Sequence, residues 1–436
     1  MPGTRAGGAA GSHRLGRPGE RHPTAGPVIK YLGSKRRLVP AIATLAGAQG
    51  ARSALDLFTG TTRVAQALKG SGCTVTAVDV TRTADVLARC YVATDADDPA
   101  VAPAVVDAAV ERLNRLPGVP GYVAETFCRT ARYFRPENGA RIDAVRQAIE
   151  CEHAGTPLWP VLLTSLLEAA DRVDSTTGVQ MAYLKQWAPR AAKPLELRPP
   201  ALLPGPGSAV RGDAVALVES GQLGHVDLAY LDPPYNQHRY DANYHVWETI
   251  VAADDPEHYG VAAKRVDLRD PETRSPFNGR RTMPDALAGV VAGVDATVVV
   301  LSYNDESWLT LDELVELCAV RGAVEVLAFD SARYVGARIG IHGPSGAKVG
   351  TVSHLRNVEY LLLAGPRRTV SRMAAALPEA RFDLQRAARP TWAQAGRRQV
   401  AADGGAGSRQ RTGRPVGAGT ASRTTDDEGG ARHGDA

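Results

Sequence analysis

Several features that define other classes of protein are missing from this sequence. No apolar run reaches the ~18 residues that a membrane-spanning helix requires, so we expect no membrane partner. The N-terminus lacks the apolar segment of a secretory signal. No C-x-x-C pair occurs among an odd number of cysteines, Cys73, Cys90, Cys128, Cys151 and Cys318. We therefore expect neither a disulfide framework nor a zinc site, and we expect a reduced, cytoplasmic protein.

Two kinds of ligand site are also disfavoured. The histidines His225, His245, His258 and His342 show no spacing typical of metal ligands, so we expect no metal. The G-x-G-x-x-G motif of a nicotinamide dinucleotide site is absent. The net charge of +4 is compatible with a polyanionic partner. Since arginine is concentrated in the last 71 residues, any groove for such a partner in the rest of the chain would be local.

One stretch carries a specific chemical signal. The apolar run Leu228–Leu231 predicts a buried strand, and Asp232-Pro233-Pro234-Tyr235 follows it directly. Proline cannot donate to a sheet ladder, so the strand must end there, and ligands bind at the carboxyl ends of strands in open α/β sheets. Asp232 and the carbonyl of Pro233 can each accept an N–H from an amino group on a planar base. The ring of Tyr235 can stack on that base.

A second pattern predicts a nucleoside-type site. The strand at 54–57, which contains Asp56, is followed by Phe58, by the small residues around Gly60 and by a helix. Small residues let the backbone approach a ligand, and the first N–H groups of a helix favour a carboxylate. Asp79 ends the next strand, about 20 residues after the turn, where an acid can bind ribose hydroxyls.

These motifs resemble those of DNA amino-methyltransferases that modify adenine. Asp-Pro-Pro-Tyr resembles their catalytic tetrad, and the segment around 31–35 resembles their N-terminal motif. The resemblance implies that S-adenosyl-L-methionine is the cofactor and that it is bound by Tyr31, Lys35, Asp56, Phe58, Gly60, Asp79, Asp213 and Asp232. One departure is that Thr61-Thr62 stand where the family often has a second glycine.

The order of the motifs is that of the Dam-like alpha group. It implies an α/β fold, namely a Rossmann-like S-adenosylmethionine-dependent methyltransferase sheet with a mainly helical inserted domain. We expect a disordered leader at 1–27 and a mostly disordered Arg/Gly-rich tail at 366–436. Residues 28–81 and 205–365 would form the catalytic domain, and 82–204 the helical insertion with the target-recognition region. The implied partner is double-stranded DNA, with a cognate restriction endonuclease if the enzyme serves restriction-modification or phage defence. The oligomeric state is not predicted.

Three further segments are candidates for contact with DNA. Aromatic and basic residues alternate in the set Tyr122, Phe127, Arg129, Arg132, Tyr133, Phe134 and Arg135, as they do on nucleic-acid-binding faces. The polar and aromatic stretch 236–248 predicts a flexible lip beside a flipped base. The arginines of 255–284 are interpreted as a solvated loop, with phosphate binding as the alternative: Arg265, Arg269, Arg274, Arg280 and Arg281.

Other functions stay open at this point. Methyltransferases that use the amino group of cytosine usually have Ser in place of the acid, and Asp232 disfavours them. Enzymes that modify RNA adenine or protein glutamine commonly have Asn there. A catalytically inactive DNA-binding protein is the alternative outside enzymology, and the intact tetrad with Lys35 disfavours it.

Overall fold

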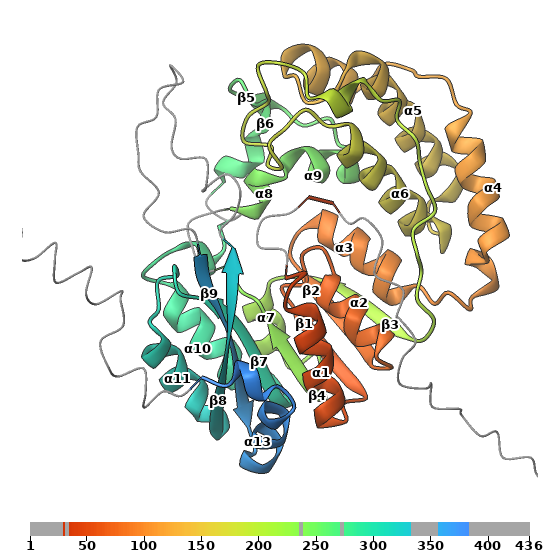
Figure 1. Ribbon diagram of the computed structural model, residues 1–436. Coiled ribbons are helices and arrows are strands. Elements are labelled where there is room, and N and C mark those ends of the chain that lie inside the picture. Colours follow the sequence, from red (N-terminus) through yellow and green to blue (C-terminus); the bar gives the residue numbers. More distant parts are fainter. Residues whose placement is uncertain (1–28, 31–34, 235–238, 271–273, 333–355, 383–436) are drawn as a thin grey trace, which may run out of the picture. The chain divides into compact units, whose positions relative to one another are not determined.

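The fold is organised around a seven-stranded mixed sheet with the strand order β3-β2-β1-β4-β7-β9-β8 (Figure 1). The computed structural model describes residues 29–30, 35–234, 239–270, 274–332 and 356–382. The first five strands of that order, β3, β2, β1, β4 and β7, are parallel to one another, and β9 runs antiparallel to both β7 and β8. The strands are β1 Ser53–Leu57, β2 Thr74–Asp79, β3 Gly207–Arg211, β4 Val226–Leu231, β7 Ala296–Asn304, β8 Ala323–Ala332 and β9 Arg356–Gly365.

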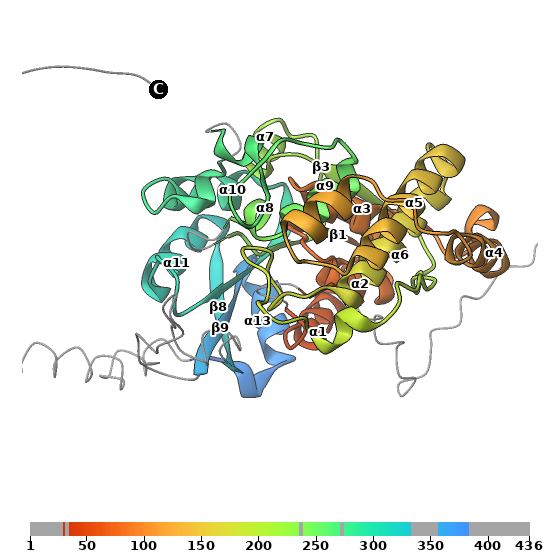
Figure 2. The same cartoon turned by 90° about the horizontal axis from the view of Figure 1, so that it is seen from above.

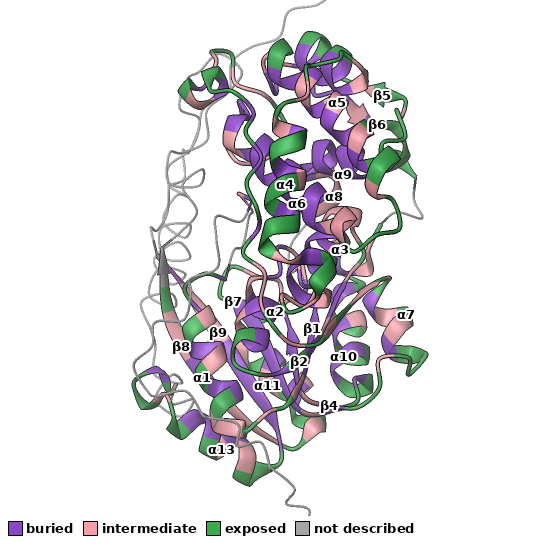
Figure 3. Ribbon diagram, turned by 90° about the vertical axis from the view of Figure 1, so that its right-hand side faces the viewer, coloured by how far each residue is buried: buried purple, intermediate pink, exposed green. Residues whose placement is uncertain are grey.

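The central strands are apolar because both of their faces are covered. β4 and β7 are buried along almost their whole length (Figure 3), as expected of parallel strands between two layers of helices. The register pairs Leu231 with Leu57 on one side and with Leu301 on the other. β1 and β4 therefore end at the same edge. The strand order reverses between β1 and β4, and such a switch point is where open α/β sheets bind ligands.

Helices cover both faces of the sheet, and Figure 2 shows α1 and α13 on the opposite side from α7 and α10. One group contains α1 Val39–Gln49, α2 Arg63–Gly70 and α13 Arg367–Ala375, and the other contains α7 Ala214–Glu219, α10 Met283–Gly293 and α11 Leu311–Cys318. α3 Arg82–Ala88 and the π-helical turn η1 Arg89–Ala93 pack beside β2 and β3.

A helical layer lies between β2 and β3 in the sequence. Residues 82–204, all of which are described, form helices and contribute no strand. Its main members are α4 Pro103–Asn114, the π-helical segment η3 Val123–Thr130, α5 Pro136–His153 and α6 Leu158–Val173. α8 Tyr240–Asn243 and α9 His245–Ala252 come after β4, and α9 packs against α3 and α6. The segment that follows the predicted tetrad therefore ties the sheet to the helical layer.

Short elements complete the described chain. A two-stranded hairpin pairs β5 His258–Tyr259 with β6 Lys264–Arg265. The single turns of 3₁₀-helix are η2 Pro99–Val101, η4 Pro189–Ala192, η5 Val266–Arg269, η7 Pro276–Asn278, η8 Ala319–Arg321 and η9 Pro378–Ala380. None of the described helices is long and apolar enough to cross a membrane. The described residues also contain no group of three or more His, Cys, Asp or Glu side chains that could hold a metal ion.

The predicted α/β sheet with a helical insertion is confirmed. At two of the predicted domain boundaries, a helix of the described structure packs against the sheet domain. α3, at the start of the segment 82–204, packs on the sheet rather than within the helical layer alone. α13 lies inside the segment 366–436, and its Val370 and Met373 are buried because their spacing places them on one face of the helix.

Candidate active site

A cavity of about 600 Å³ lies at the carboxyl ends of β1, β2 and β4. Its size is that of a small-molecule site. Eight of the residues predicted from the sequence line it, namely Lys35, Asp56, Phe58, Gly60, Asp79, Asp213, Asp232 and Pro234. Pro233 is buried and is not among the lining residues. Tyr31 and Tyr235 lie outside the described residues. The structure therefore brings together residues that the sequence separates by up to about 200 positions.

The turn after β1 has an unusual backbone. Phe58 and Thr62 both adopt positive φ angles, 73° and 61°, which side-chain-bearing residues rarely do. The backbone N–H of Phe58 donates to the carbonyl of Val78, which holds the turn against β2. Thr61-Thr62 was predicted to stand where a second glycine is often found, and the left-handed conformation of Thr62 is one that glycine adopts without strain. Strain of this kind is typical of ligand sites.

Asp79 joins the turn to the start of α3. Its Oδ2 accepts from the N–H of Gly60 at 2.9 Å, and its Oδ1 accepts from the N–H and the hydroxyl of Thr81, each at 2.9 Å. Burial raises the pKa of Asp79, while these donors act in the opposite direction. Because a carboxylate has about four acceptor positions, Asp79 can still accept from a ribose hydroxyl.

Asp56 is a buried acid with one oxygen to spare. Oδ2 accepts from the hydroxyl of Thr59 at 2.7 Å and from the N–H of Ala65 at 3.0 Å. Oδ1 has no hydrogen-bond partner among the described residues. Burial raises the pKa of Asp56 to about 7, and the nearby charge of Asp232 acts in the same direction. A cation in the cavity would satisfy the spare oxygen and favour the ionised form.

Asp232 pairs with a buried lysine. The Nζ of Lys35 lies 3.3 Å from Oδ1 of Asp232 and 3.1 Å from Oε2 of Glu359 in β9. Burial raises the pKa of Asp232 to about 6; Lys35 opposes this rise and Glu359 adds to it. Sequence reasoning missed Glu359. The signal that could have revealed it is a lone acid in the otherwise uncharged stretch Asn357–Gly365.

Asp213 has a structural role that the sequence did not predict. Its side chain caps α7 by accepting from the N–H of Ala216 at 3.1 Å. Asp213 itself is exposed at the rim of the cavity.

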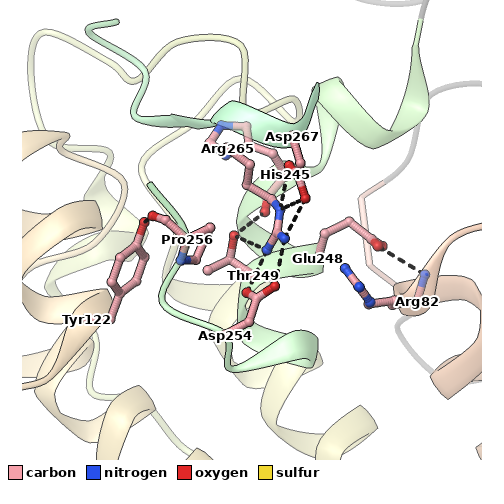
Figure 4. A network of polar contacts seen from close by, with 9 residues as sticks. All are labelled: Arg82, Tyr122, His245, Glu248, Thr249, Asp254, Pro256, Arg265 and Asp267. Carbon is pink, nitrogen blue, oxygen red and sulfur yellow. Dashed lines mark hydrogen bonds and ion pairs between the residues drawn. The ribbon is translucent and has the colours of Figure 1, made fainter. Parts of the chain in front are cut away.

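The predicted lip at 236–248 is wrong for residues 245–248, whereas Tyr240 and Asp241 line the cavity. His245 and Trp247 are buried in α9, where their aromatic rings pack into the helical layer. Glu248 turns toward α3 and accepts from the N–H of Arg82 at 3.0 Å (Figure 4). It also accepts from the N–H of Thr83 at 2.8 Å. Residues 236–238 lie outside the described residues. The aromatic residues of α9 are thus core residues, and Glu248 caps the helix that begins beside Asp79.

The predicted nucleic-acid face at 122–135 is wrong for its buried aromatic residues. Phe127, Tyr133 and Phe134 have no exposed surface and form part of the core. The rings of Phe127 and Tyr133 meet edge to face, with centroids 5.9 Å apart. Arg129 is exposed and pairs with Glu125 of the preceding helical turn.

Arg265 is neither solvated nor free to bind phosphate. It is buried, and its guanidinium donates to both oxygens of Asp254 at 2.7 Å and to Asp267 at 2.7 Å (Figure 4). Arg269 stacks on Tyr259, with its guanidinium carbon 3.8 Å from the ring centroid. Arg274 lines the cavity.

Comparison with known proteins agrees with this geometry. The family model of D12 class N6 adenine-specific DNA methyltransferases matches residues 31–316. The chain belongs to this family. The matched range contains every predicted residue that lines the cavity of this chain. Glu359 lies outside that range.

Curated relatives are type II and modification methylases. Type II methyltransferase M.NlaIII of Neisseria lactamica is 30% identical over 325 residues, which cover 70% of this chain and 92% of that protein. Type II methyltransferase M.CviAII of Paramecium bursaria Chlorella virus 1 is 31% identical, with coverages of 50% and 65%. Modification methylase LlaI of Lactococcus lactis subsp. lactis is 33% identical, with coverages of 44% and 32%. The predicted adenine-specific DNA methyltransferase is therefore confirmed at the level of the family.

Proposed function

We propose that this enzyme transfers a methyl group from S-adenosyl-L-methionine to the exocyclic amino group of an adenine flipped out of double-stranded DNA. The observation that carries the proposal is the position of Asp232. It ends β4 at the switch point of the sheet, faces the cavity and lies beside Asp56 and Lys35.

The cavity fits a cationic nucleoside cofactor. Its buried acids favour positive charge, and the spare Oδ1 of Asp56 is an acceptor that a ligand ammonium would satisfy. Asp79 would accept from the ribose hydroxyls, and Phe58 and Gly60 line the same cavity. When bound, S-adenosylmethionine supplies a methyl group on a positively charged sulfur. Tyr31, Lys35 and Asp213 complete the proposed cofactor set.

The proposed catalytic residues act by orientation. Asp232 and the carbonyl of Pro233 would accept hydrogen bonds from the two amino hydrogens of adenine. These bonds favour a pyramidal nitrogen, whose lone pair is less delocalised into the ring and is available to attack the methyl group. Proper orientation can lower a barrier by roughly 7–11 kcal/mol. Flipping the base costs roughly a few kcal/mol. Stacking on Tyr235 would return roughly 1–3 kcal/mol of that cost. Pro234 would fix the direction of the chain between Pro233 and Tyr235.

We infer a role in restriction-modification from the names of the relatives. Three relatives are called type II methyltransferases or modification methylases. On this proposal the enzyme marks one short sequence and so protects DNA from a cognate restriction endonuclease.

The reaction is tested with the purified full-length chain, plasmid DNA and cofactor carrying a radiolabelled methyl group. After digestion of the DNA to nucleosides, we expect the label in N6-methyl-2′-deoxyadenosine. Label in methylcytosine, or label transferred to RNA but not to DNA, would contradict the proposal.

A further inference from the structure

Two exposed apolar tips stand side by side near the cavity. Met181, in the segment 177–187, is 45% exposed, and Val261, in the turn between β5 and β6, is 79% exposed. Single exposed apolar side chains are common on protein surfaces, but two that lie together next to basic residues can form a contact surface. We call the residues 177–187 and 260–264 together the Met181 surface.

The segment that bears Met181 is held rigidly from behind. Gln180 is buried, its N–H donates to the carbonyl of Asn243 at 2.8 Å, and its side-chain oxygen accepts from the N–H of Val246 at 2.9 Å. His245 lies 2.9 Å from the carbonyl of Gln180, and burial lowers the pKa of His245 to about 4. The contact is therefore made by a neutral imidazole at working pH. Met181 thus projects from a fixed backbone.

A buried tyrosine contacts both this segment and the turn between β5 and β6. The hydroxyl of Tyr133 lies 2.7 Å from the carbonyl of Gln180 and 3.0 Å from the carbonyl of Ala262. The residue before Met181 and the residue after Val261 are therefore held by one buried side chain. In addition, Nζ of Lys264 lies 3.2 Å from the sulfur of Met181. The two tips form one surface.

This surface is linked to residues that line the cavity. Asn243, which accepts from Gln180, ends α8, and Tyr240 and Asp241 of α8 line the cavity. On the other side, Lys264 is followed by Arg265, which also lines the cavity. β6 lies against α9 (Figure 1). The two apolar side chains are thus connected, through Asn243 and through Lys264, to residues that line the cavity.

The charge of the surface fits a polyanion. The chain has no Asp or Glu between Asp174 and Glu196, and none from 258 to 266. The exposed Lys185 and the half-buried Lys264 lie within the surface. Beside it, Arg132 and Arg135 stack on Trp187, with guanidinium carbons 4.7 Å and 5.3 Å from the ring centroid. Phosphates of a DNA duplex attract such a cluster.

We propose that the Met181 surface docks on duplex DNA and that Met181 and Val261 enter the duplex as apolar wedges beside the target adenine. The inference rests on the proposed function and extends it to the residues that open the duplex. Proteins that unstack DNA commonly insert Met or aliphatic side chains between base steps. When a base leaves the stack, a side chain must fill the gap. A side chain on a backbone that is already fixed can do so at a small cost in conformational entropy.

The test compares two duplexes that carry the target sequence found by sequencing of methylated plasmid. In one the target adenine is paired with thymine, and in the other it faces an abasic site and is already unpaired. Met181→Ala should lower kcat/KM on the paired duplex about tenfold or more, because the cost of opening is no longer offset. On the abasic duplex the variant should match the wild type. Val261→Ala should show a smaller loss of the same pattern.

Val320→Ala is the matched control, since Val320 is 67% exposed and lies in η8, away from the cavity rim. It should match the wild type on both duplexes. Unchanged activity of both wedge variants on the paired duplex, or an equal loss on both duplexes, would overturn the proposal. A wild-type chain that methylates neither duplex would instead contradict the proposed function, so the two failures are distinguishable.

Discussion

The buried Lys35 and the half-buried Asp232 form an ion pair, with Nζ and Oδ1 3.3 Å apart, at the point where β4 ends. The pair joins the N-terminal motif to the tetrad. It also influences the charge of Asp232, the proposed catalytic residue, because burial favours the neutral carboxyl and the ammonium favours the ionised one. Glu359 contacts the same ammonium and opposes its effect on Asp232.

The first prediction concerns the acid limb of the pH–rate profile. On the proposed mechanism the ionised Asp232 accepts a hydrogen bond from the amino group, so turnover should fall as pH drops through about 6. Lys35→Met removes the charge that lowers the pKa of Asp232, so the limb should move to higher pH. Glu359→Gln removes a charge that raises the pKa of Asp232, so the acid limb of the profile should move to lower pH. Glu359→Asp, which keeps the charge, is the control. Shifts in the same direction for both variants would refute this account of the pair.

The second prediction concerns cofactor binding. Because the pKa of Asp56 is raised to about 7, the carboxyl is partly protonated near neutral pH and must lose its proton to bind a cation. Affinity for S-adenosylmethionine should therefore rise with pH through about 6 to 7 and level off above that range. Calorimetry in two buffers of different ionisation enthalpy should detect proton release. Asp56→Asn should bind more weakly and should show a flatter pH dependence; an unchanged pH profile would exclude Asp56 from the site.

The third prediction concerns the ribose. Asp79→Ala should weaken cofactor binding about 10- to 100-fold, which corresponds to the loss of one or two hydrogen bonds to a charged acceptor. Asp79→Asn keeps one acceptor oxygen and should lose less. Titration calorimetry measures both. Equal affinity of wild type and Asp79→Ala would mean that Asp79 serves only to hold Gly60 and Thr81.

The sequence predicted the site better than the surface around it. Asp232 and Asp79 could be located because each ends an apolar strand, and parallel strands bring such ends to one edge. Phe127 and Tyr133 could not be assigned, since the spacing of aromatic and basic residues does not reveal which face packs inward. Glu359 lies 324 positions from Lys35, and a contact at that separation depends on the order of strands in the sheet, which the sequence does not state.

The fourth prediction concerns the stability of the rim. Arg265→Met leaves Asp254 and Asp267 without their guanidinium, and we expect the free energy of unfolding to fall by about 1–3 kcal/mol, since both acids are partly exposed. Arg265→Lys should recover only part of this loss, because an ammonium cannot donate bidentately. Arg115→Met, which removes an exposed pair with Glu111, is the control and should change stability little. Chemical denaturation measures all three, and an unchanged midpoint for Arg265→Met would contradict the prediction.

The central claim is that Asp232 positions the amino group of an adenine in DNA. The most direct test is single-molecule sequencing of plasmid DNA from cells that express the wild-type chain, Asp232→Ala or Asp107→Ala, the last a change at an exposed acid on α4. The account predicts methyladenine at one short sequence with the wild type and with Asp107→Ala, and none with Asp232→Ala, which has no side-chain oxygen to accept from the amino group. Methyladenine at the same sequence and level in cells that express Asp232→Ala would contradict it.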